Sequence, residues 1–222
     1  MATETNEDPA VTTTAGFGRR FGWLISLAVT LALVVLIRSF LVQSFYVPSG
    51  SMEPLITPGD RVLVNRLDTN PERGDVVVFD GTEVFGRIPV TPQSPGLIGS
   101  VVGGVGKVLG IDTGETDYVK RVIGVGGDRV ACAKGVLSVN GQRVDEPYLP
   151  AGTSSCQSDF DVKVPAEHLF MMGDNRANSA DSRAHLGSPG GGMVPVGDVI
   201  GAVTWRYWPL DRLGNVPDGA VR

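Results

Sequence analysis

The chain has 222 residues, a hydrophobic content of 42% and a formal net charge of −5. This length fits one domain plus an anchor, and the apolar content is enough for a core. The acidic balance and the lack of any basic run exclude a nucleic-acid-binding surface. The two histidines and two cysteines, with no Cys-x-x-Cys pair, are too few for an obvious four-ligand zinc site, so we expect no metal.

Residues 1–20 are mostly small and polar, which predicts a disordered tail. An uncharged apolar run follows at residues 23–37. Its flanks extend it to residues 21–42, which reaches the ~20 residues that a spanning helix needs. A cleaved secretory signal is the alternative, but no clear small-x-small site follows the run. We therefore predict one N-terminal transmembrane helix.

The arginines around this run predict its orientation. Arg19 and Arg20 precede the run, whereas Arg38 alone follows it closely. Because positively charged flanks stay on the cytoplasmic side, the N-terminus is expected in the cytoplasm. Residues 43–222 are then expected to form an exoplasmic domain of a single-pass protein of the cell membrane.

Beyond the apolar run, the pattern changes to short strand-like segments separated by turn residues. Strands are expected at residues 61–65, 75–79, 117–124, 136–139, 142–144, 168–172 and 199–205. Asn140 and Gly141 form a two-residue hairpin signal. Glycine, at 30 of 222 residues, also favours a turn-rich, mainly β domain. Residues 85–116 form a glycine-rich apolar insertion, for which a packed loop and a membrane-facing surface are equally open.

The segment 48–54, Pro-Ser-Gly-Ser-Met-Glu-Pro, places two small hydroxyls in a turn. Its prolines disfavour helix, and Gly50 permits a tight turn. Either Ser49 or Ser51 is then a candidate nucleophile, provided that a base lies nearby. On this stretch alone, an ordinary turn or helix cap is the alternative.

The predicted strand 117–124 carries two adjacent cations. Strand alternation places Lys120 on the same face as Tyr118 and Val122, and Arg121 on the opposite face. A lysine with apolar neighbours loses solvation, which lowers its pKa and suits it to general-base chemistry. The alternative is an edge-strand lysine that prevents aggregation.

The segment 173–183 is the densest polar stretch of the chain. It contains two arginines, two aspartates, two asparagines and two serines, which can build a hydrogen-bonded network. Asp174 or Asp181 is expected to pair with Arg183 or with Arg121. A solvated loop is the alternative.

In combination, these segments closely resemble bacterial type I signal peptidases, the membrane-anchored Ser-Lys proteases that remove signal peptides from exported proteins. The matching pieces are 48–54 with Gly59-Asp60, 117–121 with Gly127-Asp128, and 173–176 with 178–183. They occur in the family's order, and the resemblance covers Phe45 to about Pro209, without the insertion 85–116. Ala177 departs from the family, which often has an acidic residue there, so a local salt bridge is expected to be missing.

The resemblance implies a signal-peptidase-like β fold and roles for single residues. Ser51 matches the nucleophile, and Lys120 matches the general base. Ser49 matches the hydroxyl that forms the oxyanion hole together with the backbone N–H of Ser51. Ser179 matches the serine that orients the lysine. The implied reaction is cleavage of preproteins after small-x-small motifs, without a cofactor.

Structural ion pairs and a substrate cleft are also implied. Asp174 matches the partner of Arg121, and Asp181 matches the partner of Arg183. The substrate is expected to lie extended between two segments, which consist of Phe45, Tyr46, Val47 and Pro48 on one side and Asp117, Tyr118 and Val119 on the other. The implied partners are preproteins with signal peptides and the lipid bilayer.

Cys132 and Cys156 are the only cysteines. Outside the cytoplasmic membrane they would meet oxidising conditions, which predicts a disulfide. Two unpaired thiols are the alternative, because a sequence does not show whether the two Cβ atoms come close.

Three other functions compete with signal-peptide cleavage. A self-cleaving repressor would share the Ser-Lys chemistry, but the predicted transmembrane helix argues against it. A non-catalytic anchored β domain that binds envelope partners, or a structural stalk, would tolerate loss of Ser51 and Lys120. Neither of these two explains three matching motifs in order.

Overall fold

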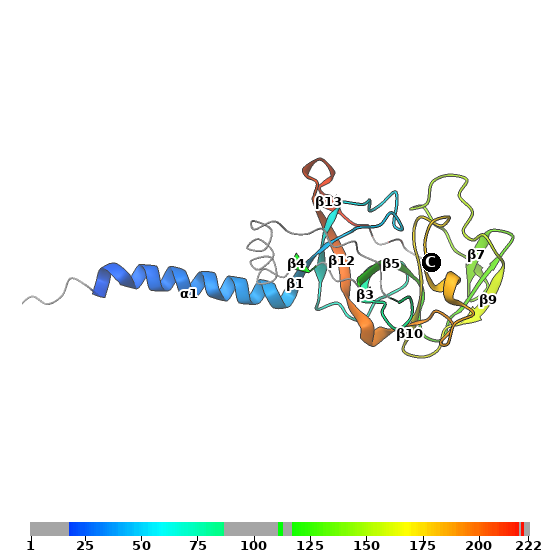
Figure 1. Cartoon of the computed structure of the whole chain (residues 1–222), viewed down its shortest axis with the longest axis horizontal. Helices are drawn as coiled ribbons and strands as arrows, with labels where there is room; N and C mark the ends of the chain where they lie inside the picture. The colour runs from blue at the N-terminus through cyan, green and yellow to red at the C-terminus, as the bar shows by residue number, and fades with distance from the viewer. Residues whose placement is uncertain (1–17, 87–110, 113–116, 218, 220–222) are drawn as a thin grey trace, which may run out of the picture. The chain divides into compact units, whose positions relative to one another are not determined.

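The computed structural model describes residues 18–86, 111–112, 117–217 and 219 (Figure 1). The chain divides into two compact units, residues 1–38 and 39–222. Most of the expected tail 1–20 and of the insertion 85–116 lies outside the described residues.

Helix α1, Gly18–Leu41, covers most of the expected helix 21–42 (Figure 1). Its leucines and alanines favour a helix, and it contains no proline. The side chains from Gly22 to Val35 are exposed. Within the described part of the chain, no helix combines the length and apolar content required to cross a membrane. Membrane insertion of α1 therefore stays a prediction.

A nine-stranded sheet forms the centre of the second unit, in the order β11-β10-β5-β3-β12-β2-β1-β4, with β13 beside β12. Its pairings are antiparallel except for β1 with β4. The strands are β1 Val42–Tyr46, β2 Arg61–Asn65, β3 Val76–Asp80, β4 Ile111–Asp112, β5 Asp117–Gly124, β10 His168–Met172, β11 Val194–Pro195, β12 Val199–Trp208 and β13 Gly214–Asn215.

A second sheet has four strands in the order β8-β7-β6-β9. They are β6 Arg129–Ala133, β7 Val136–Val139, β8 Gln142–Arg143 and β9 Phe160–Lys163. Asn140 and Gly141 join β7 to β8 with positive φ angles of 54° and 82°. These angles are those of a two-residue hairpin turn, which confirms the predicted hairpin. The described part of this unit also contains three short 3-10 helices, Ser182–His185, Val196–Asp198 and Leu210–Arg212.

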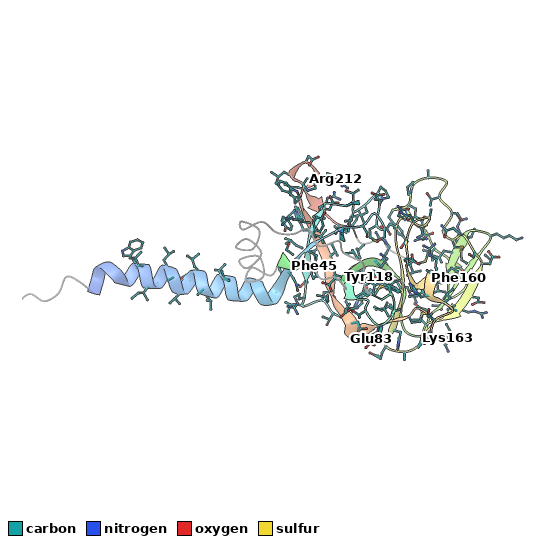
Figure 2. All side chains as sticks on the ribbon, in the orientation of Figure 1. Phe45, Glu83, Tyr118, Phe160, Lys163 and Arg212 are labelled. Carbon is teal, nitrogen blue, oxygen red and sulfur yellow. A yellow bond between two sulfur atoms is a disulfide. The ribbon has the colours of Figure 1, made fainter. Side chains whose placement is uncertain are left out.

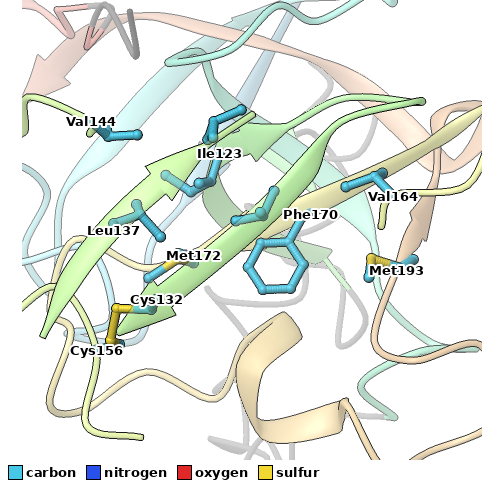
Figure 3. Close-up of a cluster of buried hydrophobic side chains, with 11 residues drawn as sticks. Ile123, Cys132, Leu137, Val144, Cys156, Val164, Phe170, Met172 and Met193 are labelled. Carbon is cyan, nitrogen blue, oxygen red and sulfur yellow. A yellow bond between two sulfur atoms is a disulfide. The ribbon is translucent and has the colours of Figure 1, made fainter. Parts of the chain in front are cut away.

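One apolar cluster joins the two sheets (Figure 3). Ile123 of β5 and Phe170 of β10 pack in it with Leu137 of β7, and all three side chains are at most 1% exposed. The structure joins Cys132 to Cys156 in a disulfide at the edge of this cluster, with Cα atoms 6.5 Å apart. The small sheet is therefore fixed to β5 and β10, the strands that precede the polar segment 173–183.

Candidate active site

The serine-containing turn follows β1 directly, and buried side chains and a backbone hydrogen bond hold it in place. Met52 and Ile56 are fully buried in the core under β1 and β2. The backbone N–H of Val47 donates to the Asp60 carbonyl at 3.0 Å, which closes the base of the loop. Ser51 is half-buried at the top of this turn.

Lys120 of β5 lies against this turn, 69 residues further along the chain. Its Nζ donates a 2.6 Å hydrogen bond to the Oγ of Ser51 and a 3.0 Å hydrogen bond to the Val119 carbonyl. The Lys120 residue is only 2% exposed. The Oγ atoms of Ser49 and Ser51 are 3.4 Å apart. The structure therefore brings together Ser49, Ser51 and Lys120.

Burial changes the proton affinity of Lys120. Desolvation lowers the pKa of its ammonium to about 8, although the carboxylates of Asp181 and Asp174 act in the opposite direction. At pH 7, an amine with this pKa is neutral about a tenth of the time, far more often than an ordinary lysine. A neutral amine next to a hydroxyl can accept its proton.

Arg121 points to the opposite side of β5, as the alternation predicts. Its guanidinium forms two hydrogen bonds with the Asp174 carboxylate, at 2.9 and 2.8 Å. Both side chains are fully buried. The guanidinium also donates to the Gly74 carbonyl at 2.6 Å and lies 4.0 Å from the centre of the Tyr148 ring. These contacts compensate a buried charge and fix the start of the polar segment.

Asp181 and Arg183 form the second ion pair, at 2.8 Å. Burial opposes ionisation of Asp181, but hydrogen bonds from the Arg183 guanidinium and from the backbone N–H of Gly173 keep the pKa of this carboxyl below its usual value. Asp181 therefore remains an anion near Lys120 at neutral pH.

The Ser179 hydroxyl is buried, and its Oγ has no hydrogen-bond partner within the described ranges. A Cβ atom on Gly173 would lie 2.2 Å from Ser179 Oγ and 2.4 Å from the Ser51 carbonyl oxygen. Glycine at this position therefore allows the polar segment to pack directly on the backbone of Ser51.

Figure 2 labels Phe45 and Tyr118, which belong to the two expected substrate segments. Phe45 and Val47 are buried, whereas Tyr46 is 42% exposed. Among the described residues, β4 pairs with β1 at Ser44 and Phe45, and β10 pairs with β5 from Arg121 onward. Tyr118 and Val119 are half-buried on the stretch of β5 that β10 does not cover.

Two further groups at the site were not assigned from the sequence. The buried Arg176 pairs with Glu146 at 2.5 Å, so it finds an acidic partner although residue 177 is alanine. Arg212 pairs with the buried Asp60 at 3.1 Å, and so holds the end of the serine-containing loop. The Gly59-Asp60 motif indicates that Asp60 matters, but no local pattern points to Arg212.

A mainly β domain in which a serine hydroxyl is hydrogen-bonded to a buried lysine has the features of a Ser-Lys peptidase. The comparisons with known proteins agree. Residues 20–208 match the family described as "Signal peptidase, peptidase S26". The chain is 36% identical to the signal peptidase I of Mycobacterium tuberculosis (strain H37Rv) over 222 residues, which cover 89% of this chain and 75% of that protein.

The signal peptidase I of Bacillus caldolyticus is 32% identical over 88% of this chain and 93% of its own length. A crystal structure of a signal peptidase I from Enterococcus faecalis is 23% identical, with a TM-score of 0.39, and covers 61% of this chain and 97% of that one. By the extent of the family match and the identity to the curated relatives, this chain belongs to the signal peptidase family, peptidase S26.

Proposed function

We propose that this protein is a serine endopeptidase that removes signal peptides from exported preproteins. The observation that supports this most directly is the 2.6 Å contact between Lys120 Nζ and Ser51 Oγ in a chain of the signal peptidase family. The curated relatives are named signal peptidase I, which supports the same substrate class.

In the proposed reaction, the neutral amine of Lys120 takes the proton of the Ser51 hydroxyl as Oγ attacks the scissile carbonyl carbon. The negative charge that develops on the carbonyl oxygen is stabilised by the Ser51 N–H and the Ser49 hydroxyl. The Lys120 ammonium then gives its proton to the leaving amine, and an acyl-enzyme on Ser51 remains. A water molecule, deprotonated by Lys120, hydrolyses this ester and restores the serine.

The surrounding polar groups keep this pair in place. Ser179 is proposed to orient the lysine because it matches the lysine-orienting serine of the family, and its buried hydroxyl lies near Gly173 and the Ser51 backbone. The Arg121–Asp174 and Arg183–Asp181 ion pairs are proposed to be structural, since their charges are compensated within the protein.

An extended substrate is proposed to add a strand between two segments, Phe45–Pro48 and Asp117–Val119. Main-chain hydrogen bonds would supply affinity, and alternate side chains would point into the domain. Small side chains are proposed at these alternate positions of the substrate, as in small-x-small cleavage motifs, in line with the relatives named signal peptidase I.

Helix α1 is proposed to anchor the protein in the cell membrane as a single span. The apolar run 23–37, with side chains exposed from Gly22 to Val35, supports this proposal. The arginine asymmetry supports a cytoplasmic tail at residues 1–20, a helix at 21–42 and an exoplasmic catalytic domain at 43–222, with 85–116 as its insertion. Protease added to intact spheroplasts should then digest the domain, and protection before lysis would contradict this orientation.

The activity is tested with the full chain in detergent or liposomes. The wild-type protein should cut a labelled precursor after its signal peptide, and a mechanism-based acylating inhibitor should modify Ser51. Ser51→Ala should abolish both cleavage and labelling, whereas the exposed Ser158→Ala should change neither. Cleavage by a folded Ser51→Ala protein would refute the proposal.

A further inference from the structure

Asn175 contacts the nucleophile's backbone twice. Its own backbone N–H donates to the carbonyl of Ser51 at 3.0 Å. Its side-chain Nδ2 donates to the carbonyl of Gly50, also at 3.0 Å. A carbonyl oxygen only accepts hydrogen bonds, so the amide nitrogen rather than the amide oxygen must face Gly50.

These two carbonyls belong to the peptide units on either side of the Ser51 Cα atom. The first unit joins the Gly50 C=O to the Ser51 N–H, and the second begins with the Ser51 C=O. Fixing both units fixes the backbone angles of Ser51, and with them the starting direction of its side chain. Asn175 therefore controls the orientation of Ser51 without touching the reacting hydroxyl.

The first peptide unit has a direct chemical consequence. In a planar trans peptide, the N–H points opposite to the C=O. The Asn175 amide holds the Gly50 carbonyl on the protein side, and the backbone N–H of Glu53 donates to the same oxygen at 3.2 Å. The Ser51 N–H must then point away from Asn175, and it has no acceptor among the described residues. An unoccupied donor in a fixed direction is what an oxyanion hole requires.

Asn175 can act as a clamp because it is itself held on both sides. The preceding residue, Asp174, is bound to the buried Arg121 by two hydrogen bonds. The Asn175 carbonyl accepts the backbone N–H of Asn178 at 3.0 Å. Arg121 follows Lys120 on β5. This strand therefore positions the proposed base directly, and through the contacts of Asp174 and Asn175 it also positions the Ser51 N–H.

We propose that Asn175 is a positioning residue that aims the backbone N–H of Ser51 at the developing oxyanion. This proposal rests on the function proposed above and concerns the same site. It predicts that loss of the Asn175 amide weakens stabilisation of the transition state and leaves both substrate binding and the proton affinity of Lys120 nearly unchanged.

The test uses Asn175→Ala and the nearly isosteric Asn175→Leu in the full-length protein, since either substitution removes the donor without adding charge. The exposed Asn215→Ala on β13 is the matched control. Loss of an oxyanion donor lowers kcat by about 10²–10³-fold. Because Asn175 acts through a peptide unit that keeps a second donor from Glu53, we expect a fall of about 10- to 100-fold in kcat. KM should stay within about threefold of the wild-type value.

Two readouts separate positioning from general damage. The concentration of active protein is first measured by titration with the acylating inhibitor, so that misfolded molecules do not count. A substrate-like peptide boronate forms a tetrahedral, negatively charged adduct with Ser51 that places a boron-bound oxygen in the oxyanion hole. Its affinity should then fall by about the same factor as kcat. The same peptide without boron should bind as to the wild type, and the pH midpoint of kcat should not move.

Wild-type kcat per active molecule in either Asn175 variant would overturn the proposal. A shifted pH midpoint with unchanged boronate affinity would also overturn it, because Asn175 would then act on Lys120. If Asn175→Leu fails to fold, Asn175→Ala and its boronate affinity decide the matter. Cleavage by Ser51→Ala would instead refute the proposed function, so the two failures are distinguishable.

Discussion

Lys120 and Arg121 are neighbours on β5, yet their cations lie on opposite sides of the strand. The Lys120 ammonium binds the Ser51 hydroxyl at 2.6 Å, whereas the Arg121 guanidinium binds the Asp174 carboxylate. This separation matters because a buried arginine stays charged and needs an anion, while a buried lysine can lose its proton. The same strand therefore supplies a fixed charge to the scaffold and a titratable amine to the proposed active site.

Lys120→Arg should abolish turnover if Lys120 is the base. A guanidinium does not deprotonate near neutral pH, so it cannot accept the Ser51 proton. Precursor cleavage by the purified variant, with folding confirmed by circular dichroism, is the measurement. Lys163→Arg, at an exposed position of β9, is the control and should cleave at the wild-type rate. Near-wild-type turnover by Lys120→Arg would eliminate Lys120 and direct attention to the two histidines.

The pH profile should report the titration of Lys120. Because the neutral amine is the reactive form, kcat/KM should rise with pH through the lowered pKa, which is about 8. The Asp181 carboxylate raises the pKa of Lys120, so Asp181→Asn should move the midpoint to lower pH. Asp161→Asn, at an exposed position of β9, should leave the midpoint in place. A midpoint unaffected by Asp181→Asn, in a folded protein, would argue that another group titrates.

Lys120 should also reduce stability at neutral pH. Its pKa is about 8 in the folded protein, whereas an unperturbed lysine has a pKa of 10.5. The unfolded chain thus binds more protons between these two values, and stability should rise with pH across this window. Below pH 8, this difference in pKa lowers the free energy of unfolding by about 3 kcal/mol. A substitution that removes the amine would regain this stability, but it would also lose the lysine's hydrogen bonds, which offsets about 1 kcal/mol of the gain.

Lys120→Met should therefore be more stable than the wild type at pH 6.5, and this advantage should disappear towards pH 10.5. Urea unfolding of the two proteins at both pH values measures the difference. An advantage that is the same at pH 6.5 and pH 10.5 would show that the lysine keeps an ordinary pKa in the folded protein.

The Arg121–Asp174 pair should behave as a buried structural ion pair. Asp174→Leu leaves a buried, uncompensated guanidinium and should destabilise the domain by about 3–5 kcal/mol. Adding Arg121→Met removes that charge and should restore most of the stability. The exposed pair of Arg129 and Asp161 is the control, because Asp161→Leu should cost less than about 1 kcal/mol. Additive losses in the Arg121→Met/Asp174→Leu protein would contradict a coupled pair.

Local patterns predicted part of this architecture. Alternation placed Lys120 and Arg121 on opposite faces, and the Asn140-Gly141 turn predicted its hairpin, because both depend only on neighbouring residues. Lys120 and Ser51 are 69 residues apart in the chain, and no local pattern indicates that they are in contact. It was expected only from the resemblance to signal peptidases.

Contacts between residues far apart in the chain were harder to predict. Asn175 reaches the carbonyl of Gly50 across 125 residues. Arg212 reaches Asp60 across 152 residues. A carbonyl acceptor exists at every position, so nothing in the sequence distinguishes Gly50 from its neighbours. The expected strand at 199–205 also continues to Trp208, since irregular pairing lets β12 extend along β2.

Gly173→Ala should impair catalysis more than folding. Its Cβ would lie 2.2 Å from Ser179 Oγ and 2.4 Å from the Ser51 carbonyl oxygen, so these groups must move apart. Overpacking of this kind costs about 1–3 kcal/mol of stability. A displacement of the nucleophile by about 1 Å can lower the rate by about 100-fold. We therefore expect a folded protein whose kcat is about 100-fold below that of the wild type. Gly197→Ala is the control, because its Cβ would meet no atom within 4 Å. Wild-type turnover by Gly173→Ala, with Gly197→Ala unchanged, would contradict the close packing of the polar segment on Ser51.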